Sequence, residues 1–351
     1  MKYEPKIDGL RAISILLVIF HHWFSQRWET GYIGVTIFFV ISGYLITGII
    51  AKDDDSGASL KARALDFYWR RALRLFPPYY VCLLLLAVFN VEDIRQTIWW
   101  NATYTTNIEV ALNNAWNGSS HFWSLAVEEQ FYLVWFFLMA VLRGRARMAA
   151  VLICLMIGPA FRAAMLLAGQ STFKDVLLPS VVDSLAAGGL IFFLKERMGW
   201  IKIESGVPPL MGGLALSAVC VALNHTHLYA NSWWMIFNRD VVTISGGLLL
   251  LAGLSKVDSP FINWLNWGWL RHIGQVSYGV YIFHFFIPSL IGGMARRLNV
   301  NLNSAVGNVL CLIALAVVVE LSWRFIETPA LRLKKSGWPR RRLGSQLHDF
   351  A

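Results

Sequence analysis

Apolar stretches long enough to cross a lipid bilayer recur along the whole of this chain. A helix of about 20 apolar residues spans the roughly 30 Å hydrocarbon core, and about ten such windows can be counted. They cover residues 8–26, 33–51, 79–89, 123–142, 148–168, 177–194, 207–223, 236–254, 276–294 and 304–323. Nothing in them alternates like a barrel strand, and a spanning segment must satisfy its own backbone hydrogen bonds. The sequence therefore predicts an all-α, polytopic transmembrane helical bundle.

Composition agrees with a membrane protein. Of 351 residues, 56% are hydrophobic and only 15% are charged, whereas soluble domains are about 25% charged. The net charge of +10 would suggest nucleic acid as the partner of a soluble protein, but here it reflects cationic loops, so we predict no nucleic acid. The cysteines all fall inside apolar runs and are too dispersed for a metal motif, which predicts buried thiols rather than disulfides. They are Cys82, Cys154, Cys220 and Cys311.

The distribution of Lys and Arg predicts the topology. Alternate loops, starting from the N-terminus, hold dense basic clusters. The other loops hold only scattered cations, which are Arg27, Arg95, Lys174, Arg239, Arg296 and Arg297. By the positive-inside rule the dense clusters face the cytoplasm. We therefore expect both termini to be cytoplasmic, consistent with an even number of spans.

The first apolar window carries two ionisable side chains, Arg11 and His22, separated by ten residues. On an ideal α-helix eleven steps of 100° return to within roughly 20° of the start, and the two residues lie roughly 16 Å apart along the axis. A cation and an imidazole on one helix face inside a bilayer are costly unless both are used. We interpret this face as the site of a long, phosphate-bearing substrate, with its anionic end near Arg11 and its reactive end near His22.

A basic cluster precedes the third window. Arg71 and Arg74 lie at positions i and i+3, on one side of a helical turn, and Arg70 adds a third charge. The planar guanidinium group suits phosphate because it makes bidentate hydrogen bonds. The alternative is ordinary anchoring to anionic lipid at the cytoplasmic boundary. The Pro77-Pro78 pair that follows predicts a helix start there, since proline is favoured in a first turn.

Two adjacent carboxylates, Glu128 and Glu129, enter the fourth window among aromatic residues. Helical neighbours are about 100° apart, so at most one of them points at a given partner. A carboxylate at this place can orient an imidazole or act as an acid. The alternative is a favourable interaction of both charges with the helix N-terminal dipole. Trp123 and Ser124, just before them, are candidates for shaping an acceptor pocket.

Further ionisable residues lie inside the windows, and any such group is a candidate for function. For His284 we expect mainly a structural hydrogen bond to a neighbouring helix, and we keep it as a candidate substrate contact. Asp183 is either a pairing partner or substrate-facing, and Glu327 is expected to pair with a basic cluster. His225 and His227 have no carboxylate or thiolate framework around them, so no metal site is predicted.

Taken together, the motifs resemble the acyltransferase 3 family, the integral-membrane acyltransferases that O-acetylate bacterial surface glycans. Six motifs carry the resemblance in the correct order, and together they are specific although each alone is weak. They are Asp8-Gly9-Leu10-Arg11 with His22, the run 34–44, the run 67–77, the run 122–132, the run 277–284 and Glu327-Thr328-Pro329. The resemblance covers nearly the whole chain, from about residue 7 to residue 335.

The resemblance implies an acyl-CoA-dependent O-acyltransferase of the bacterial inner membrane. Such enzymes move an acyl group, usually acetyl from acetyl-CoA, to a hydroxyl of a lipid-linked or exported saccharide, such as O-antigen or exopolysaccharide. The Arg-x10-His motif of the family maps onto Arg11 and His22, and its Arg-x-x-Arg motif maps onto Arg71 and Arg74. We expect a membrane domain over 1–335 and a basic cytoplasmic tail over 336–351. Because the chain is short, the membrane-only branch of the family is expected.

The expected mechanism uses His22 as the general base that takes the proton from a sugar hydroxyl, with Glu128 or Glu129 orienting the ring. A covalent acyl-histidine or acyl-serine route is an open variant. Two rival functions remain: an acyltransferase acting on a small molecule, and a transporter or flippase of a lipid-linked saccharide. The transporter would need no coenzyme A.

Overall fold

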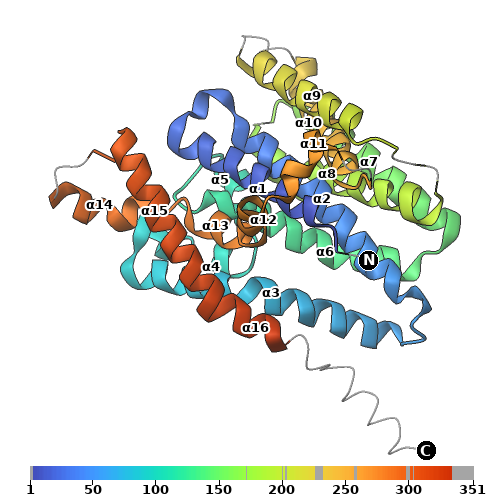
Figure 1. The fold of residues 1–351 in the computed structure, drawn as a ribbon, viewed down its shortest axis with the longest axis horizontal. Helices are drawn as coiled ribbons and strands as arrows, with labels where there is room; N and C mark the ends of the chain where they lie inside the picture. The colour runs from blue at the N-terminus through green and yellow to red at the C-terminus, as the bar shows by residue number, and fades with distance from the viewer. Residues whose placement is uncertain are drawn as a thin grey trace, which may run out of the picture. The chain divides into compact units, whose positions relative to one another are not determined.

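The computed structural model describes residues 3–170, 172–199, 201, 204–225, 232–256, 259–297, 301–302 and 304–333. All the regular secondary structure in these ranges is helical (Figure 1), which confirms the predicted all-α class. The expected basic tail, 336–351, lies outside the described residues, and so does His227. By its internal contacts the chain divides into unit 1, residues Met1–Ile49 and Thr103–Ser277, and unit 2, residues Ile50–Ala102 and Tyr278–Ala351.

The described part of the chain contains nine helices that are long and apolar enough to cross a membrane. They are Pro5–Phe24, Thr30–Lys52, Leu60–Phe89, Ser120–Val141, Gly144–Leu167, Leu178–Arg197, Val207–His225, Trp233–Gly253 and Ala305–Leu333. Each corresponds to one of the predicted windows, and the window 276–294 has no counterpart. The chain is therefore a multi-pass membrane protein.

Unit 1 holds most of the helices. They are α1 (Pro5–Ile19) with the π-helical turn η1 (Phe20–Phe24), α2 (Thr30–Lys52), α5 (Thr106–Asn113), α6 (Trp123–Val141), α7 (Gly144–Leu167), the short turn η6 (Thr172–Val176), α8 (Leu178–Phe192), α9 (Val207–His225), α10 (Ser232–Gly253), α11 (Pro260–Asn263) and α12 (Gly268–Gln275). Helices α9 and α10 lie side by side (Figure 1), as do α7 with α8 and α1 with α12.

Unit 2 holds α3 (Leu60–Phe89), α4 (Ile98–Ala102), α13 (Ser277–Phe283, whose first residue, Ser277, belongs to unit 1), α14 (Ile287–Arg297), α15 (Ala305–Ser322), the π-helical turn η10 (Trp323–Glu327) and α16 (Thr328–Leu333). Helix α16 packs beside α3, as Figure 1 shows, and α14 packs on α15.

The predicted start of the third span, after Pro77-Pro78, is wrong. Helix α3 begins at Leu60, where the side chain of Ser59 accepts a hydrogen bond from the Ala62 N–H, and both prolines lie inside it. Two successive prolines remove two helical N–H donors, so the carbonyls four residues before them, those of Leu73 and Arg74, lose their usual helical donor. The Tyr278 hydroxyl donates to the next carbonyl, that of Leu75, at 2.9 Å. The basic cluster is thus helical and continuous with the span, rather than part of a loop.

The predicted ninth span, 276–294, is also wrong as one continuous helix. Helix α13 ends at Phe283, and α14 starts at Ile287. Pro288 explains the break, because proline has no N–H for a bond to the residue four before it and disfavours helical geometry at its predecessor. The residues at the break, His284 and Phe286, are fully buried. Irregular backbone at membrane depth is tolerated where protein surrounds it.

Glycines allow a close helix contact in unit 1. A Cβ placed on Gly43 of α2 would overlap the Leu185 carbonyl oxygen of α8, and a Cβ on Gly188 of α8 would overlap the Val40 carbonyl oxygen of α2. The two backbones therefore touch, as expected where small residues line a membrane-helix interface. This close approach is possible because position 43 carries no side chain. The four cysteines are free and buried, as predicted.

We expect Gly43→Ala to lower the melting temperature of the detergent-solubilised protein. The added methyl group must displace the α8 backbone, and overpacking of this kind costs about 1–3 kcal/mol. Gly268→Ala is the matched control, because nothing lies within 4 Å of a Cβ at that position. Thermal unfolding followed by size-exclusion chromatography measures both variants. Equal melting temperatures for the two variants would contradict a backbone contact at Gly43.

Candidate functional site

His22 lies in the π-helical turn η1 rather than on a continuous α-helix. Helix α1 ends at Ile19, and the chain continues with i to i+5 bonding until Ser25 N–H bonds the Phe20 carbonyl at 3.0 Å. A π-turn rotates less per residue than the α-helical 100°. The predicted rotation of 20° between Arg11 and His22 therefore does not apply. Single π-turns within helices are frequent at functional sites.

The ring of His22 is fixed by a main-chain bond. Its Nδ1 lies 3.0 Å from the Val18 carbonyl oxygen. A carbonyl only accepts hydrogen bonds, so in the neutral ring Nδ1 carries the proton and Nε2 is the basic nitrogen. The ring of His21 packs edge-on against that of His22, with centroids 5.1 Å apart.

Arg11 lies near the other end of α1 and is held by two neighbours. Its Nη2 donates to the Ser277 hydroxyl at 3.0 Å, and its Nη1 lies 3.9 Å from Asp8. The Asp8 carboxylate also accepts a bond of 2.6 Å from the Tyr3 hydroxyl. The ion pair is therefore long and its carboxylate is shared, and the Arg11 side chain keeps 15% of its surface exposed.

The two glutamates of α6 are half-buried, and so is Trp123, whereas Ser124 is buried. Trp123 packs against a small apolar cluster formed by Val110, Ala111 and Val176, which joins α5 to η6. The interaction of His22 with Glu128 or Glu129 remains a prediction.

Neighbouring residues of the same α6 motif anchor the helix. Gln130 exchanges hydrogen bonds of 2.8 and 3.1 Å with Asn107, and it donates to the Tyr104 carbonyl at 3.0 Å. The hydroxyl groups of Tyr132 and Ser42 are 2.5 Å apart and join α6 to α2. These residues hold the chain around the glutamates.

In unit 2, Arg70, Arg71 and Arg74 all lie on α3. Arg70 is engaged within its own helix, since its Nε donates to both oxygens of Asp66 at 2.9 Å. Arg71 and Arg74 are half-buried. Because α3 is a regular α-helix at this point, these two guanidinium groups share one side of a turn, as predicted.

His284 and Glu327 are buried in unit 2. The Nδ1 of His284 lies 2.7 Å from the Tyr281 carbonyl, which is a local contact. The expected hydrogen bond of His284 to a neighbouring helix stays a prediction. Glu327 ends the π-turn η10 and accepts a bond of 3.3 Å from Ser322. A Cβ on Gly279 would lie 3.1 Å from its carboxylate, so the glycine of the 277–284 motif makes room for this glutamate.

A family model described as an acyltransferase domain, Acyl_transf_3, matches residues 4–322. The chain belongs to the acyltransferase 3 family. This confirms the family that the motifs predicted.

Curated relatives extend the comparison. The acyltransferase 3 chain is 28% identical over 368 residues to the peptidoglycan O-acetyltransferase OatA of Listeria monocytogenes, with 96% of this chain and 57% of that protein covered. It is 28% identical over 360 residues to the putative peptidoglycan O-acetyltransferase YrhL of Bacillus subtilis, covering 93% and 55%. It is 26% identical over 360 residues to the O-acetyltransferase OatA of Staphylococcus aureus, covering 96% and 58%. The chain thus spans little more than half the length of these relatives. No solved structure matches it.

A buried charge cluster in unit 1 of the acyltransferase 3 chain was missed by sequence reasoning. Arg162 of α7, 3% exposed, donates to Asp183 of α8 at 2.9 Å and to Asp240 of α10 at 2.8 Å. Its remaining donors reach the carbonyls of Ile236 at 2.8 Å and Ser180 at 2.5 Å. Asp183 is therefore a pairing partner, which decides between the two predicted roles. In the sequence, Arg162 is an isolated charge within an apolar run, and this was the one feature that could have indicated a buried ion pair.

Two carboxylates outside the spans have shifted pKa values. Burial raises the pKa of Asp175, in η6, and the nearby Arg239 and Arg162 oppose that shift. Burial also raises the pKa of Glu29, opposed by its hydrogen bond from Asn224. Protonation of both groups therefore begins at a higher pH than for an exposed carboxylate.

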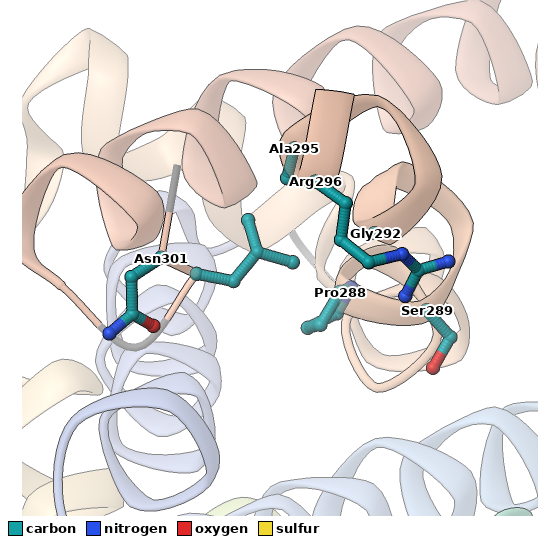
Figure 2. A pocket seen from close by; sticks show the side chains of 7 residues that line it. Pro288, Ser289, Gly292, Ala295, Arg296 and Asn301 are labelled. Carbon is teal, nitrogen blue, oxygen red and sulfur yellow. The ribbon is translucent and has the colours of Figure 1, made fainter. Parts of the chain in front are cut away.

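A hollow of about 430 Å³ lies beside α14 in unit 2, and Figure 2 shows its polar lining of Ser289, Arg296 and Asn301. No residue of the predicted site lines it. Ser289 is held by a hydrogen bond to Glu92.

We expect Arg162→Met to destabilise the fold by about 3–5 kcal/mol, because it leaves buried carboxylates without their cation. Adding Asp183→Asn to this variant should restore part of the loss by removing one uncompensated charge. Thermal unfolding in detergent measures both. The control is Arg324→Met, which removes an exposed ion pair with Glu320 and should cost at most about 1 kcal/mol. A loss for Arg162→Met no larger than for the control would contradict a stabilising cluster.

Proposed function

We propose that this chain is a membrane O-acyltransferase that moves an acetyl group from acetyl-CoA to a hydroxyl of a cell-surface glycan. The observation that carries the proposal is the family match over residues 4–322. The names of the relatives favour peptidoglycan as the acceptor, and lipid-linked or exported saccharides are the wider class. As the location we propose the bacterial inner membrane.

The proposed general base is Nε2 of His22. The acceptor hydroxyl oxygen attacks the thioester carbonyl carbon while its proton passes to Nε2. The carbon–sulfur bond then breaks, and coenzyme A leaves as the thiol after taking that proton. The Val18 carbonyl supports this role, because its bond to Nδ1 leaves Nε2 as the basic nitrogen of the neutral ring.

This bond also changes the role that we propose for the glutamates. The orienting position at Nδ1 is filled by the main chain, so Glu128 or Glu129 would act through charge, by stabilising the imidazolium formed on proton transfer. Trp123 and Ser124 remain proposed contacts to the acceptor. His284 is also proposed as a substrate contact, and the support for this is its position in the 277–284 motif of the family.

Arg71 and Arg74 are proposed to bind the phosphates of the donor. They are separated by one turn of α3, on a spacing that lets two guanidinium groups meet one or two phosphates. Arg70 contributes less in this proposal, since Asp66 already engages its Nε. Arg11 is proposed as a further donor contact through its place in the Arg-x10-His motif.

The proposed topology keeps both termini on the cytoplasmic side. The dense Lys and Arg clusters support this orientation, but nine crossings alone would place the termini on opposite sides. We therefore propose that the broken segment α13–α14 supplies a tenth crossing, in the manner of the discontinuous helices of other membrane proteins.

We expect His22→Ala to abolish acetyl transfer while leaving expression and melting temperature close to wild type. The measurement is release of the coenzyme A thiol from acetyl-CoA by the purified protein, with and without glycan acceptor. His272→Ala, an exposed histidine of α12, is the control and should keep wild-type rates. Near-normal turnover by His22→Ala would refute the base, and an absence of any acceptor-dependent thiol release by wild type would refute the enzyme.

We expect Arg71→Gln and Arg74→Gln each to raise the KM for acetyl-CoA about 10- to 100-fold, the size expected for a lost hydrogen bond to a charged group. The same variants should discriminate less than wild type between acetyl-CoA and its analogue without the 3′-phosphate. Steady-state thiol release measures both effects. Arg324→Gln serves as the matched surface control. If the variants keep the full preference for the 3′-phosphate, these arginines bind lipid instead of the donor.

A further inference from the structure

A second buried arginine lies close to the Arg162 cluster and has few partners. Arg239 of α10 is 5% exposed. We had counted it among loop cations, but the structure places it inside a spanning helix. Its guanidinium carbon lies 4.8 Å above the ring of Tyr32, and its Nη2 makes one long bond of 3.4 Å to the Asp175 carbonyl. Among the described residues, its Nε and Nη1 have no hydrogen-bond partner.

The contrast with Arg162 is informative. Both arginines are buried, and Arg162 contacts the helix α10 on which Arg239 lies. Arg162, however, is held by two carboxylates and two carbonyls. A buried donor without a partner destabilises the folded protein, and more so when it belongs to a charged group. In a membrane protein such a group is a candidate for function. The guanidinium nitrogens of Arg162 are all engaged by nearby carboxylates and carbonyls, whereas two donors of Arg239 stay buried without such partners in the described part of the chain.

A series of contacts leads from Arg239 to the proposed base. The Tyr32 ring under Arg239 follows Gly31, and a Cβ on Gly31 would lie 2.9 Å from the ring of His21. His21 in turn packs on His22. The buried Nδ1 of His21 also has no hydrogen-bond partner among the described residues. Unpartnered donors and an unpartnered ring nitrogen thus lie on the same series of contacts as the base.

The Asp175 carboxylate interacts with Arg239 through charge, but no ion pair or side-chain hydrogen bond between them is found among the described residues. Asp175 offers its main-chain carbonyl rather than its carboxylate, and Asp240 is bound to Arg162. The Tyr32 hydroxyl is engaged with Asn238 at 2.8 Å, so its ring faces the cation only through its π-face. Nε and Nη1 lie on different edges of the guanidinium plane, and Nη2, whose bond to Asp175 is long, completes each edge. An edge of this kind matches the two oxygens of a carboxylate or a phosphate.

We propose that Arg239 recognises an anionic group of the acceptor, either a sugar carboxylate or the phosphate of a lipid carrier. The inference rests on the proposed function, since it assigns the acceptor side of the same reaction. The anion would bind one edge of the Arg239 guanidinium group, with Nε or Nη1 as the unpartnered donor, and hold the acceptor hydroxyl near His22. His21 is then a positioning residue beside the base.

The test measures binding by the purified full chain to two matched pairs of probes, without acetyl-CoA. One pair is N-acetylmuramic acid and N-acetylglucosamine, which differ by a carboxylate-bearing lactyl group. The other pair is a polyprenyl phosphate and the corresponding polyprenol. Wild type should prefer the anionic member of one pair by about 10- to 100-fold in Kd, and the pair that shows the preference identifies the source of the anion.

Arg239→Gln should lose this preference while binding the neutral probes as wild type does. Arg239→Lys, which keeps the charge without the planar fork, should retain part of the preference and serves if the glutamine variant does not fold. Arg324→Gln is the control and should keep the full wild-type preference for the anionic probe. The inference is overturned if wild type binds anionic and neutral probes equally, or if Arg239→Gln keeps the preference. Acceptor-dependent thiol release is measured separately, so its absence would overturn the proposed function and leave the anion site standing.

Discussion

A membrane interior offers almost no water to a charged or polar group, and this constraint explains most of the unusual features of the chain. Each ionisable residue in a span must find a partner in the protein or serve a ligand. Arg162 represents the first solution, because its donors reach two carboxylates and two carbonyls of α8 and α10. Arg239 represents the second, because two of its donors are buried without a partner in the described part of the chain. Arg11 lies between these extremes, with one hydroxyl partner and a long, shared ion pair.

The motif residues concentrate where helices deviate from regular α geometry. His22 lies in the π-turn η1, Glu327 ends the π-turn η10, and His284 follows the last residue of α13. The main-chain carbonyls of Val18 and Tyr281 lie within hydrogen-bond distance of the imidazoles of His22 and His284. The irregular backbone therefore both positions and orients the two histidines that the family motifs contain.

Much of the fold followed from hydropathy alone, because a bilayer-spanning helix has a minimum length and a nearly complete apolar composition. The nine long helices and the buried cysteines were predictable in this way. The errors arose at prolines, where one residue type permits both a helix start and a tolerated interior position. Pro77-Pro78 lie inside α3, whereas Pro288 accompanies a break. The π-turn at His22 has no comparable signal in the residue pattern. Pairing was one of two roles expected for Asp183, but its partner Arg162 and the contribution of Asp240, 78 residues from Arg162, could not be read from the sequence.

The bond from His22 to the Val18 carbonyl has a consequence for how sequence change acts on this protein. A main-chain partner is present whatever amino acid occupies position 18, so substitution there leaves the tautomer of the imidazole intact provided the helix persists. A one-residue insertion or deletion between Arg11 and His22 is different, because it shifts the helical register and points the ring in another direction. The spacing of the two residues is thus under stricter constraint than the identity of the apolar residues between them.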